Sequence, residues 1–225
     1  MLTFDAWRSI TGLRHGFLDR GECGGGRSWE AILAIAGAPF PIALPRQVHG
    51  TRIVSGRVGM EPLEADAVAS GTDGLLVGIV TADCVPVLLV HRGRRAAAAV
   101  HAGWRGAAAG VLETAVRHLA SELRAPALEL EAAIGPAICG RCYQVGPEVL
   151  EAFRARTGDT TAPAWSERSG RHHVDLRHAA ELLLRATGVT RIATVGPCTA
   201  CAAGFCSYRR DGAGCGRQLS FVGWV

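Results

Sequence analysis

The sequence lacks long apolar runs and any recognisable export segment. Its longest apolar stretches, such as residues 74–80, end well short of the roughly 18 residues that a membrane helix needs. The first residues contain no charged start followed by an apolar core, so we expect no signal peptide. These absences predict a cytoplasmic protein with no membrane partner.

Basic tracts are absent as well. The chain has 24 basic residues (Lys plus Arg) and 20 acidic ones, its formal net charge is +4, and the arginines are scattered singly or in pairs. No aromatic side chains are interleaved with them, so the pattern argues against a nucleic-acid partner. A small anion such as phosphate suits the same mild positive charge.

No long linker, low-complexity tract or internal repeat divides the chain, so we expect one domain over residues 1–225. The eight cysteines occur without a secretion signal, which predicts reduced thiols rather than a disulfide framework. The sequence leaves the oligomeric state open.

The hydrophobic pattern predicts groups of strands followed by helices. The expected strands span residues 75–80, 85–90, 96–100, 128–134 (half-exposed), 190–195 and 219–224. The expected helices span residues 28–36, 107–123, 147–156 and 176–186, the last with Asp175 as its N-cap. Residues 21–26 are expected to form a glycine-rich loop. Because helices do not alternate regularly with strands, the order favours an α+β layered domain with mixed sheets over a doubly wound parallel fold.

A thiol and an imidazole flank a predicted hairpin. Cys84 precedes one buried strand and His101 follows the next, with Gly93 at the centre of the turn between them. A tight hairpin centred on Gly93 would set Cys84 opposite His101 or Ala102, where Cβ atoms lie roughly 5 Å apart. The pattern therefore predicts that the two side chains meet.

His49, upstream in a Gln-Val-His-Gly segment, is a third candidate ligand. Cysteine and two histidines suit zinc, and three protein ligands leave the open fourth position of a catalytic site. Asp83 is a candidate acceptor for the ring N–H of a ligand. The same residues also fit a metal-free site in which Cys84 is a nucleophile and His101 its base, or ordinary structural positions.

Two Cys-x-x-Cys pairs, Cys139 with Cys142 and Cys198 with Cys201, raise the question of a second metal. Four cysteines could form a structural zinc site, but residues 143–197 separate the pairs, far more than the roughly 15–20 residues of a compact zinc ribbon. We therefore expect buried free thiols, with a second metal or a disulfide as the alternatives.

Arginines and a tryptophan are candidate substrate contacts. Arg105 stands at the start of the helix 107–123, where a guanidinium and a helix N-terminus together attract an anion. Arg209, beside a turn, either binds phosphate or is solvated. Trp104 either stacks on a flat heterocycle or fills the core. The remaining candidate histidines are assigned no role and are expected at the surface: His91, His118, His172, His173 and His178.

Several motifs occur together in a familiar order. They are HGF (15–17), QVHG (47–50), TADCVPVL (81–88), HAGWRG (101–106), IGP (134–136), YQV (143–145) and FCSYRR (205–210). The sequence resembles the bacterial family once labelled multicopper polyphenol oxidoreductase or laccase and now regarded as purine nucleoside phosphorylases. A human immune-metabolic laccase-domain protein resembles the same family.

The resemblance implies a layered α/β/β/α fold with two packed mixed sheets, similar to toxin-type cysteine hydrolases. It implies a catalytic zinc on His49, Cys84 and His101, phosphorolysis of adenosine, inosine, guanosine and methylthioadenosine, and adenosine deamination as a second activity. Copper is the alternative metal, but the several coppers of a multicopper oxidase need more ligands than these eight histidines, most of them badly placed, supply.

The expected partners are therefore purine nucleosides and phosphate. The expected catalytic residues are Cys84, His101, Asp83 (a candidate acid for the departing base) and Arg105, and the expected substrate contacts are Gln47, Trp104 and Arg209. The chain departs from the family in its short segment 21–45, which lacks Asn-Leu-Gly and Asn-Arg motifs, and in Gln144, where glutamate is usual. These departures keep two other functions open: a metal-free Cys–His hydrolase of amides or esters, and a non-catalytic nucleoside-binding protein.

Overall fold

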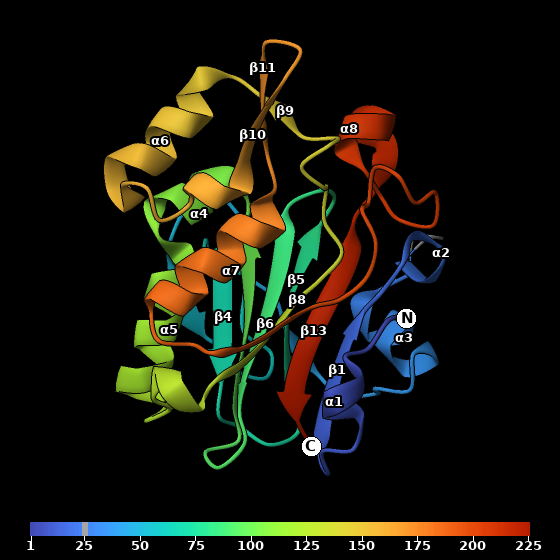
Figure 1. Cartoon of the computed structure of the whole chain (residues 1–225). Helices are drawn as coiled ribbons and strands as arrows, with labels where there is room; N and C mark the ends of the chain where they lie inside the picture. The colour runs from blue at the N-terminus through green and yellow to red at the C-terminus, as the bar shows by residue number, and fades with distance from the viewer. Residues whose placement is uncertain (24–26) are drawn as a thin grey trace.

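Two stacked mixed sheets form the centre of the protein in a computed structural model that describes residues 1–23 and 27–225 (Figure 1). The larger sheet has the order β12-β8-β6-β7-β4-β3. Its strands are β3 (Ile53–Ser55), β4 (Ala67–Ser70), β6 (Val85–His91), β7 (Ala96–Ala102), β8 (Glu131–Ile134) and β12 (Arg191–Thr194). The smaller sheet has the order β1-β13-β5-β2. Its strands are β1 (Leu13–Phe17), β2 (Ile42–Ala43), β5 (Leu75–Thr81) and β13 (Gln218–Trp224).

Helices cover the outer face of each sheet (Figure 1). The larger sheet is covered by α4 (Trp104–Ala109), α5 (Val111–Glu122), α6 (Pro147–Thr157) and α7 (Leu176–Ala186). The smaller sheet is covered by α2 (Arg20–Cys23) and α3 (Trp29–Ile35). The remaining elements are α1 (Asp5–Arg8), α8 (Tyr208–Asp211), the single turns Ala127–Glu129, Ala162–Ala164 and Gly212–Cys215, and a third sheet of β9 (Gln144–Val145), β10 (Trp165–Arg168) and β11 (Arg171–Val174).

Strand β6 shows why the layers hold together. Val87 and Leu89 pack against the helices, whereas Leu88 and Val90 pack against the smaller sheet. Successive side chains of a strand point to opposite faces, so a strand between two layers needs apolar residues at every position. The α/β/β/α layering with mixed sheets is confirmed, while the relation to toxin-type hydrolases stays a prediction.

The hairpin of β6 and β7 forms as expected, but its register differs. Val85 pairs with Ala102 and Pro86 with His101, so continuing the register sets Cys84 opposite Gly103. The prediction that Cys84 faces His101 or Ala102 was wrong because the turn is not centred on Gly93 alone. Four residues, 92–95, connect the strands, and Arg95 takes a left-handed φ of 47°.

Two other predicted elements needed correction. The expected helix 107–123 is two helices, because Gly110 has a left-handed φ of 100° that ends α4 and begins α5. The expected half-exposed strand 128–134 is shorter and buried along its whole length. Its charged residue, Glu131, is buried because Arg92 Nε lies 2.7 Å and Trp7 Nε1 lies 2.8 Å from its carboxylate.

Two of the histidines expected at the surface, His91 and His173, are buried. His91 is satisfied there, with Nε2 lying 2.9 Å from Glu129 Oε2 and Nδ1 accepting the Arg94 N–H. The expected glycine-rich loop 21–26 is partly helical, since α2 includes residues 21–23, and residues 24–26 lie outside the described part of the chain. No helix in that described part has the length and apolar character that crossing a membrane requires.

Candidate metal centre and substrate cavity

His49, Cys84 and His101 converge at one end of the two sheets. One ligand atom from each, an imidazole nitrogen or the cysteine Sγ, lies within 4.8 Å of the other two. Cys84 directly precedes β6, His101 lies in β7, and His49 comes from the loop before β3. The two imidazole rings meet edge to face, with centroids 4.8 Å apart. The chemistry of the donors and their mutual distances fit one metal ion.

Gly103 makes this close approach sterically feasible. A Cβ atom at this position would lie 3.0 Å from His49 Cδ2 and 3.1 Å from Cys84 Sγ. Both distances are tighter than ordinary van der Waals contact, so any side chain here would push the two ligands apart. The glycine thus has a steric role between the thiol and the imidazole.

Asp66 organises the cluster, and the sequence reading missed it. Its carboxylate is fully buried, and Oδ1 lies 2.8 Å from His101 Nδ1. The same carboxylate accepts the backbone N–H groups of Val48, His49 and Gly50 at 3.2, 2.9 and 2.6 Å. It therefore orients the imidazole of His101 and holds the His49 loop in place, as carboxylates behind metal-binding histidines do. The sequence feature that could have indicated Asp66 is an acidic residue directly before a buried strand, because a buried carboxylate needs hydrogen-bond partners.

Asp83 does not take the position expected for it. Its carboxylate accepts the Thr199 hydroxyl at 2.6 Å and the Arg209 backbone N–H at 2.7 Å. The expectation that Asp83 orients a ligand histidine is corrected, because Asp66 is the acceptor for His101. Asp83 adopts a left-handed φ of 83°, which turns its side chain toward the segment after β12.

The electrostatics favour a charged thiolate. Burial alone would raise the pKa of Cys84, but hydrogen bonds from His101 and His49 outweigh it and lower the pKa to about 6. Burial would lower the pKa of His101, but Asp66 and the Cys84 thiolate raise it to about 9. Burial opposes the charge of Asp66, yet hydrogen bonds from His101 and the backbone lower the pKa of its carboxyl. Near neutral pH the metal-free cluster is a thiolate–imidazolium pair.

The cluster opens into a cavity of about 690 Å³, a size typical of small-molecule sites. Every residue expected to act in catalysis, substrate contact or metal binding lines this cavity: Gln47, His49, Asp83, Cys84, His101, Trp104, Arg105 and Arg209. Further lining residues that the sequence reading did not select are Pro45, Val80, Thr81, Ala82, Tyr143, Tyr208 and Arg217. Ala82 and Tyr208 stand next to a selected residue, but no local pattern indicates which way the side chains of these lining residues face.

The cavity arginines differ in how they are held. The Arg105 guanidinium stacks on the Trp104 ring at 4.4 Å and is exposed, with no hydrogen bond or ion pair to any other described residue. The Arg209 guanidinium stacks on Tyr143 at 5.1 Å and donates to the backbone oxygens of Cys142 and Gln144. The Arg105 guanidinium is therefore the less engaged of the two, and it lies within the first turn of α4 rather than before the helix.

Gln47 has a structural contact as well as a place in the cavity wall. Its amide donates to the Val80 carbonyl and accepts the Val80 N–H, both at 2.8 Å. Tyr143 supplies the cavity with a hydroxyl that keeps its proton, because burial raises its pKa to about 12. The unusual Gln144 does not line the cavity, and its side-chain oxygen accepts from Arg171.

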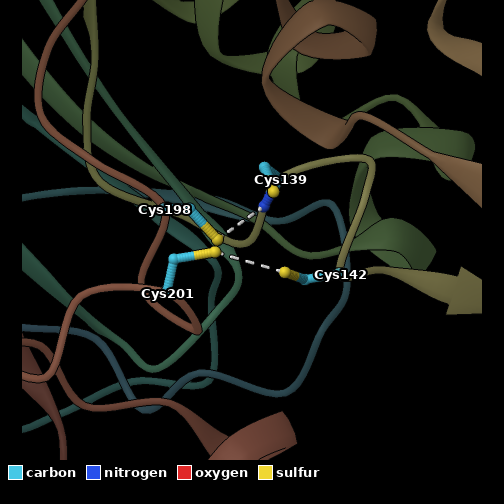
Figure 2. Close-up of side chains that lie close together, drawn as sticks. All are labelled: Cys139, Cys142, Cys198 and Cys201. Carbon is cyan, nitrogen blue, oxygen red and sulfur yellow. Dashed lines mark hydrogen bonds between the residues drawn. The ribbon is translucent and has the colours of Figure 1, made fainter.

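The four remaining cysteines of interest also converge (Figure 2). The sulfurs of Cys139, Cys142, Cys198 and Cys201 all lie within 4.8 Å of one another. The expectation of buried thiols was wrong, because Cys201 is exposed and the other three are half-buried. In the described part of the chain, this group and the His–Cys–His cluster are the two sets of side chains spaced to hold a metal.

Comparison with known proteins identifies the family. Residues 27–225 match the family model described as multi-copper polyphenol oxidoreductase laccase, and the chain belongs to this family. It is 42% identical to a purine nucleoside phosphorylase of Pseudomonas aeruginosa, over 80% of this chain and 72% of that protein. It is 34% identical to adenosine deaminase RL5 of an unknown prokaryotic organism, over 80% of this chain and 74% of that protein.

A solved structure supports the fold. A protein from Neisseria meningitidis superposes with a TM-score of 0.81 at 31% identity, covering 95% of each chain. In the described part of the chain, the two donor groups have three and four side chains, each a number that binds one ion, and no larger donor set that would match the multicopper description is found there. The site is thus a candidate metal centre beside a cavity of small-molecule size.

Proposed function

We propose that this protein is a zinc-dependent purine nucleoside phosphorylase that also deaminates adenosine, acting in the cytoplasm as one domain over residues 1–225. The observation that carries the proposal is the convergence of His49, Cys84 and His101 on a cavity that is also lined by Arg105, whose guanidinium has no hydrogen bond to another described residue. Relatives named purine nucleoside phosphorylase and adenosine deaminase support both activities. The proposed substrates are adenosine, inosine, guanosine and methylthioadenosine.

His49, Cys84 and His101 would hold the metal. Their borderline-soft donors, the orienting carboxylate of Asp66 and a fourth side open to the cavity suit zinc, while copper is the alternative for such a donor set. When bound, the metal would supply a Lewis acid that polarises a substrate atom and lowers the pKa of water to about 7.

The other residues of the cavity bind and orient the reactants. Arg105 and Arg209 provide guanidinium groups for phosphate, which attacks C1′ of the ribose while the bond to the purine breaks. The purine leaves with the bonding electron pair and takes up a proton. Trp104 and Tyr143 offer aromatic faces on which a purine can stack.

Asp83 is better suited to positioning than to proton donation. Its two carboxylate oxygens each accept a hydrogen bond, one from Thr199 and one from the Arg209 N–H. Because both oxygens of Asp83 act as acceptors, the carboxylate presents no proton to a leaving base. We therefore revise its role: Asp83 holds the backbone of Arg209 beside the phosphate position.

Product analysis tests the function directly. The protein is incubated with adenosine and with inosine, each with and without phosphate, and the products are separated chromatographically. Hypoxanthine that forms from inosine only with phosphate supports phosphorolysis, and inosine that forms from adenosine without phosphate supports deamination. Turnover by Cys84→Ala equal to that of Cys23→Ala, a control outside the cavity, would refute the role of the metal centre.

The thiolate–imidazolium pair favours one second candidate, a metal-free Cys–His hydrolase, because a lowered thiol pKa also activates a nucleophile. Metal analysis of protein purified without added zinc separates the two. About one equivalent of zinc lost on Cys84→Ala supports the phosphorylase, whereas full hydrolase activity without metal supports the alternative. Nucleoside binding without release of base or ammonia would instead indicate a non-catalytic binding protein.

A further inference from the structure

The four-cysteine group joins two segments that are far apart in sequence. Cys139 and Cys142 lie in the connection between β8 and β9, and Cys198 and Cys201 lie in the segment after β12. Figure 2 shows the side chains from the two segments turned toward one another. The Sγ atoms of Cys142 and Cys201 are 3.4 Å apart, and the Cys139 N–H donates to Cys198 Sγ at 3.2 Å.

Parallel pairing of β8 and β12 explains how the pairs meet. Ile134 pairs with Thr194 at the ends of the strands, and the chains continue side by side to a bridge between Ala137 and Cys198. Two parallel neighbours leave the sheet at the same edge, whatever length of chain connects them. The short separation between cysteine pairs that a compact zinc ribbon needs is therefore not required here, because the sheet brings the two distant pairs together.

We propose that Cys139, Cys142, Cys198 and Cys201 bind one structural zinc ion, separate from the proposed catalytic centre. Zinc held by four thiolates at about 2.3 Å in a tetrahedron places neighbouring sulfurs roughly 3.8 Å apart. The sulfurs here, one pair 3.4 Å apart and all within 4.8 Å, bracket that value. A disulfide would join them only in pairs, whereas one tetrahedral ion uses all four. Four thiolates close the coordination shell, which is the arrangement of a structural site.

Charge around the group supports a metal–thiolate centre. Zinc with four thiolates carries a net charge of about −2. The hollow beside the cysteines is lined by Arg141, Arg168 and Arg177, whose positive charges complement that excess. The acidic neighbour in this hollow, Asp175, is already engaged, because its carboxylate caps α7 by accepting the backbone N–H groups of residues 177 and 178.

The same segments make hydrogen bonds to two residues that line the substrate cavity, Asp83 and Arg209. The Cys142 carbonyl accepts from the Arg209 guanidinium at 3.2 Å, and the Thr199 hydroxyl, between Cys198 and Cys201, donates to Asp83 at 2.6 Å. An ion linking the two segments would hold these contacts in place. The structural zinc thus stabilises the positions of residues that the catalytic centre needs without contacting substrate itself.

Zinc counting distinguishes the two centres. Protein purified under reducing conditions without added metal is expected to contain about two zinc ions per chain, as measured by inductively coupled plasma mass spectrometry. Cys84→Ala is expected to lose one ion, and the double variant Cys142→Ser/Cys201→Ser is expected to lose the other. Cys23→Ala, a half-buried cysteine outside both groups, should keep both. An unchanged zinc count in the double variant would overturn the proposal. The zinc count of Cys84→Ala reports on the catalytic centre, so failure of the proposed function is distinguishable from failure of this proposal.

Cobalt spectroscopy covers the case in which the double variant does not fold. In Cys84→Ala reconstituted with Co²⁺, a tetrahedral spectrum with strong sulfur charge-transfer bands is expected, because four thiolates bind the ion. A spectrum of nitrogen and oxygen ligands would overturn the proposal. Disulfides between these cysteines would also overturn the proposal. They would lower the intact mass by two hydrogens each, measured without reductant on protein that was purified under reducing conditions.

Discussion

Replacing Asp66 by asparagine tests the organisation of the metal centre most directly. One carboxylate oxygen faces His101 Nδ1 and the His49 N–H, and the other faces the N–H groups of Val48 and Gly50. Asparagine puts an NH₂ group in place of one oxygen, so at least one backbone N–H would meet a donor instead of an acceptor. The substitution also removes the charge that stabilises the His101 imidazolium.

The size of the effect follows from these contacts. A buried N–H left without an acceptor costs about 1–3 kcal/mol, and a hydrogen bond to a charged group contributes about 1.5–3 kcal/mol. We therefore expect Asp66→Asn to lower the free energy of unfolding by roughly 3 kcal/mol or more, which corresponds to a fall in Tm of about 6–12 °C for a chain of this size. Loss of the orienting carboxylate should also weaken zinc binding by about 10–100-fold.

Thermal unfolding and a competitive zinc titration measure the two effects. Asp73→Asn is the matched control, because Asp73 pairs with Arg95 at 2.8 Å but its side chain is 60% exposed, so the change should cost less than about 1 kcal/mol. A variant at Asp66 with the same Tm and the same zinc affinity as the control would show that this carboxylate does not organise the site.

Three further changes probe the cavity. In metal-free protein, the rate of Cys84 alkylation, followed by peptide mass mapping, should rise with pH through about 6 and then level off, because the thiolate forms over that range. Bound zinc should block the alkylation. A midpoint near pH 9 would contradict the lowered pKa of Cys84. Gly103→Ala should weaken zinc binding at least about tenfold by displacing His49, whereas Gly93→Ala, whose Cβ would make only ordinary contacts, should not. Arg105→Met should raise the KM for phosphate about tenfold or more and leave that for inosine nearly unchanged; equal changes in both would argue against a phosphate contact.

Local patterns determined most of the individual elements. The apolar runs 85–90 and 96–100 predicted β6 and β7 because strands buried on both faces need apolar residues throughout. Asp175 predicted the start of α7 because a short acidic side chain satisfies free N–H groups there, and the structure confirms that cap. The expected helix 107–123 is two helices because Gly110, with its left-handed φ of 100°, ends α4 before α5 begins.

The sequence by itself determined the types of donor available and the two strands that position Cys84 and His101, since thiol, imidazole and hydrophobic period are properties of short segments. Only the tertiary structure decided that Asp66, not Asp83, supports His101, and that the cysteines after β8 and β12 share one place. Both outcomes depend on which strands become neighbours and in what register. That choice is made by burial summed over the whole core, so no single motif encodes it.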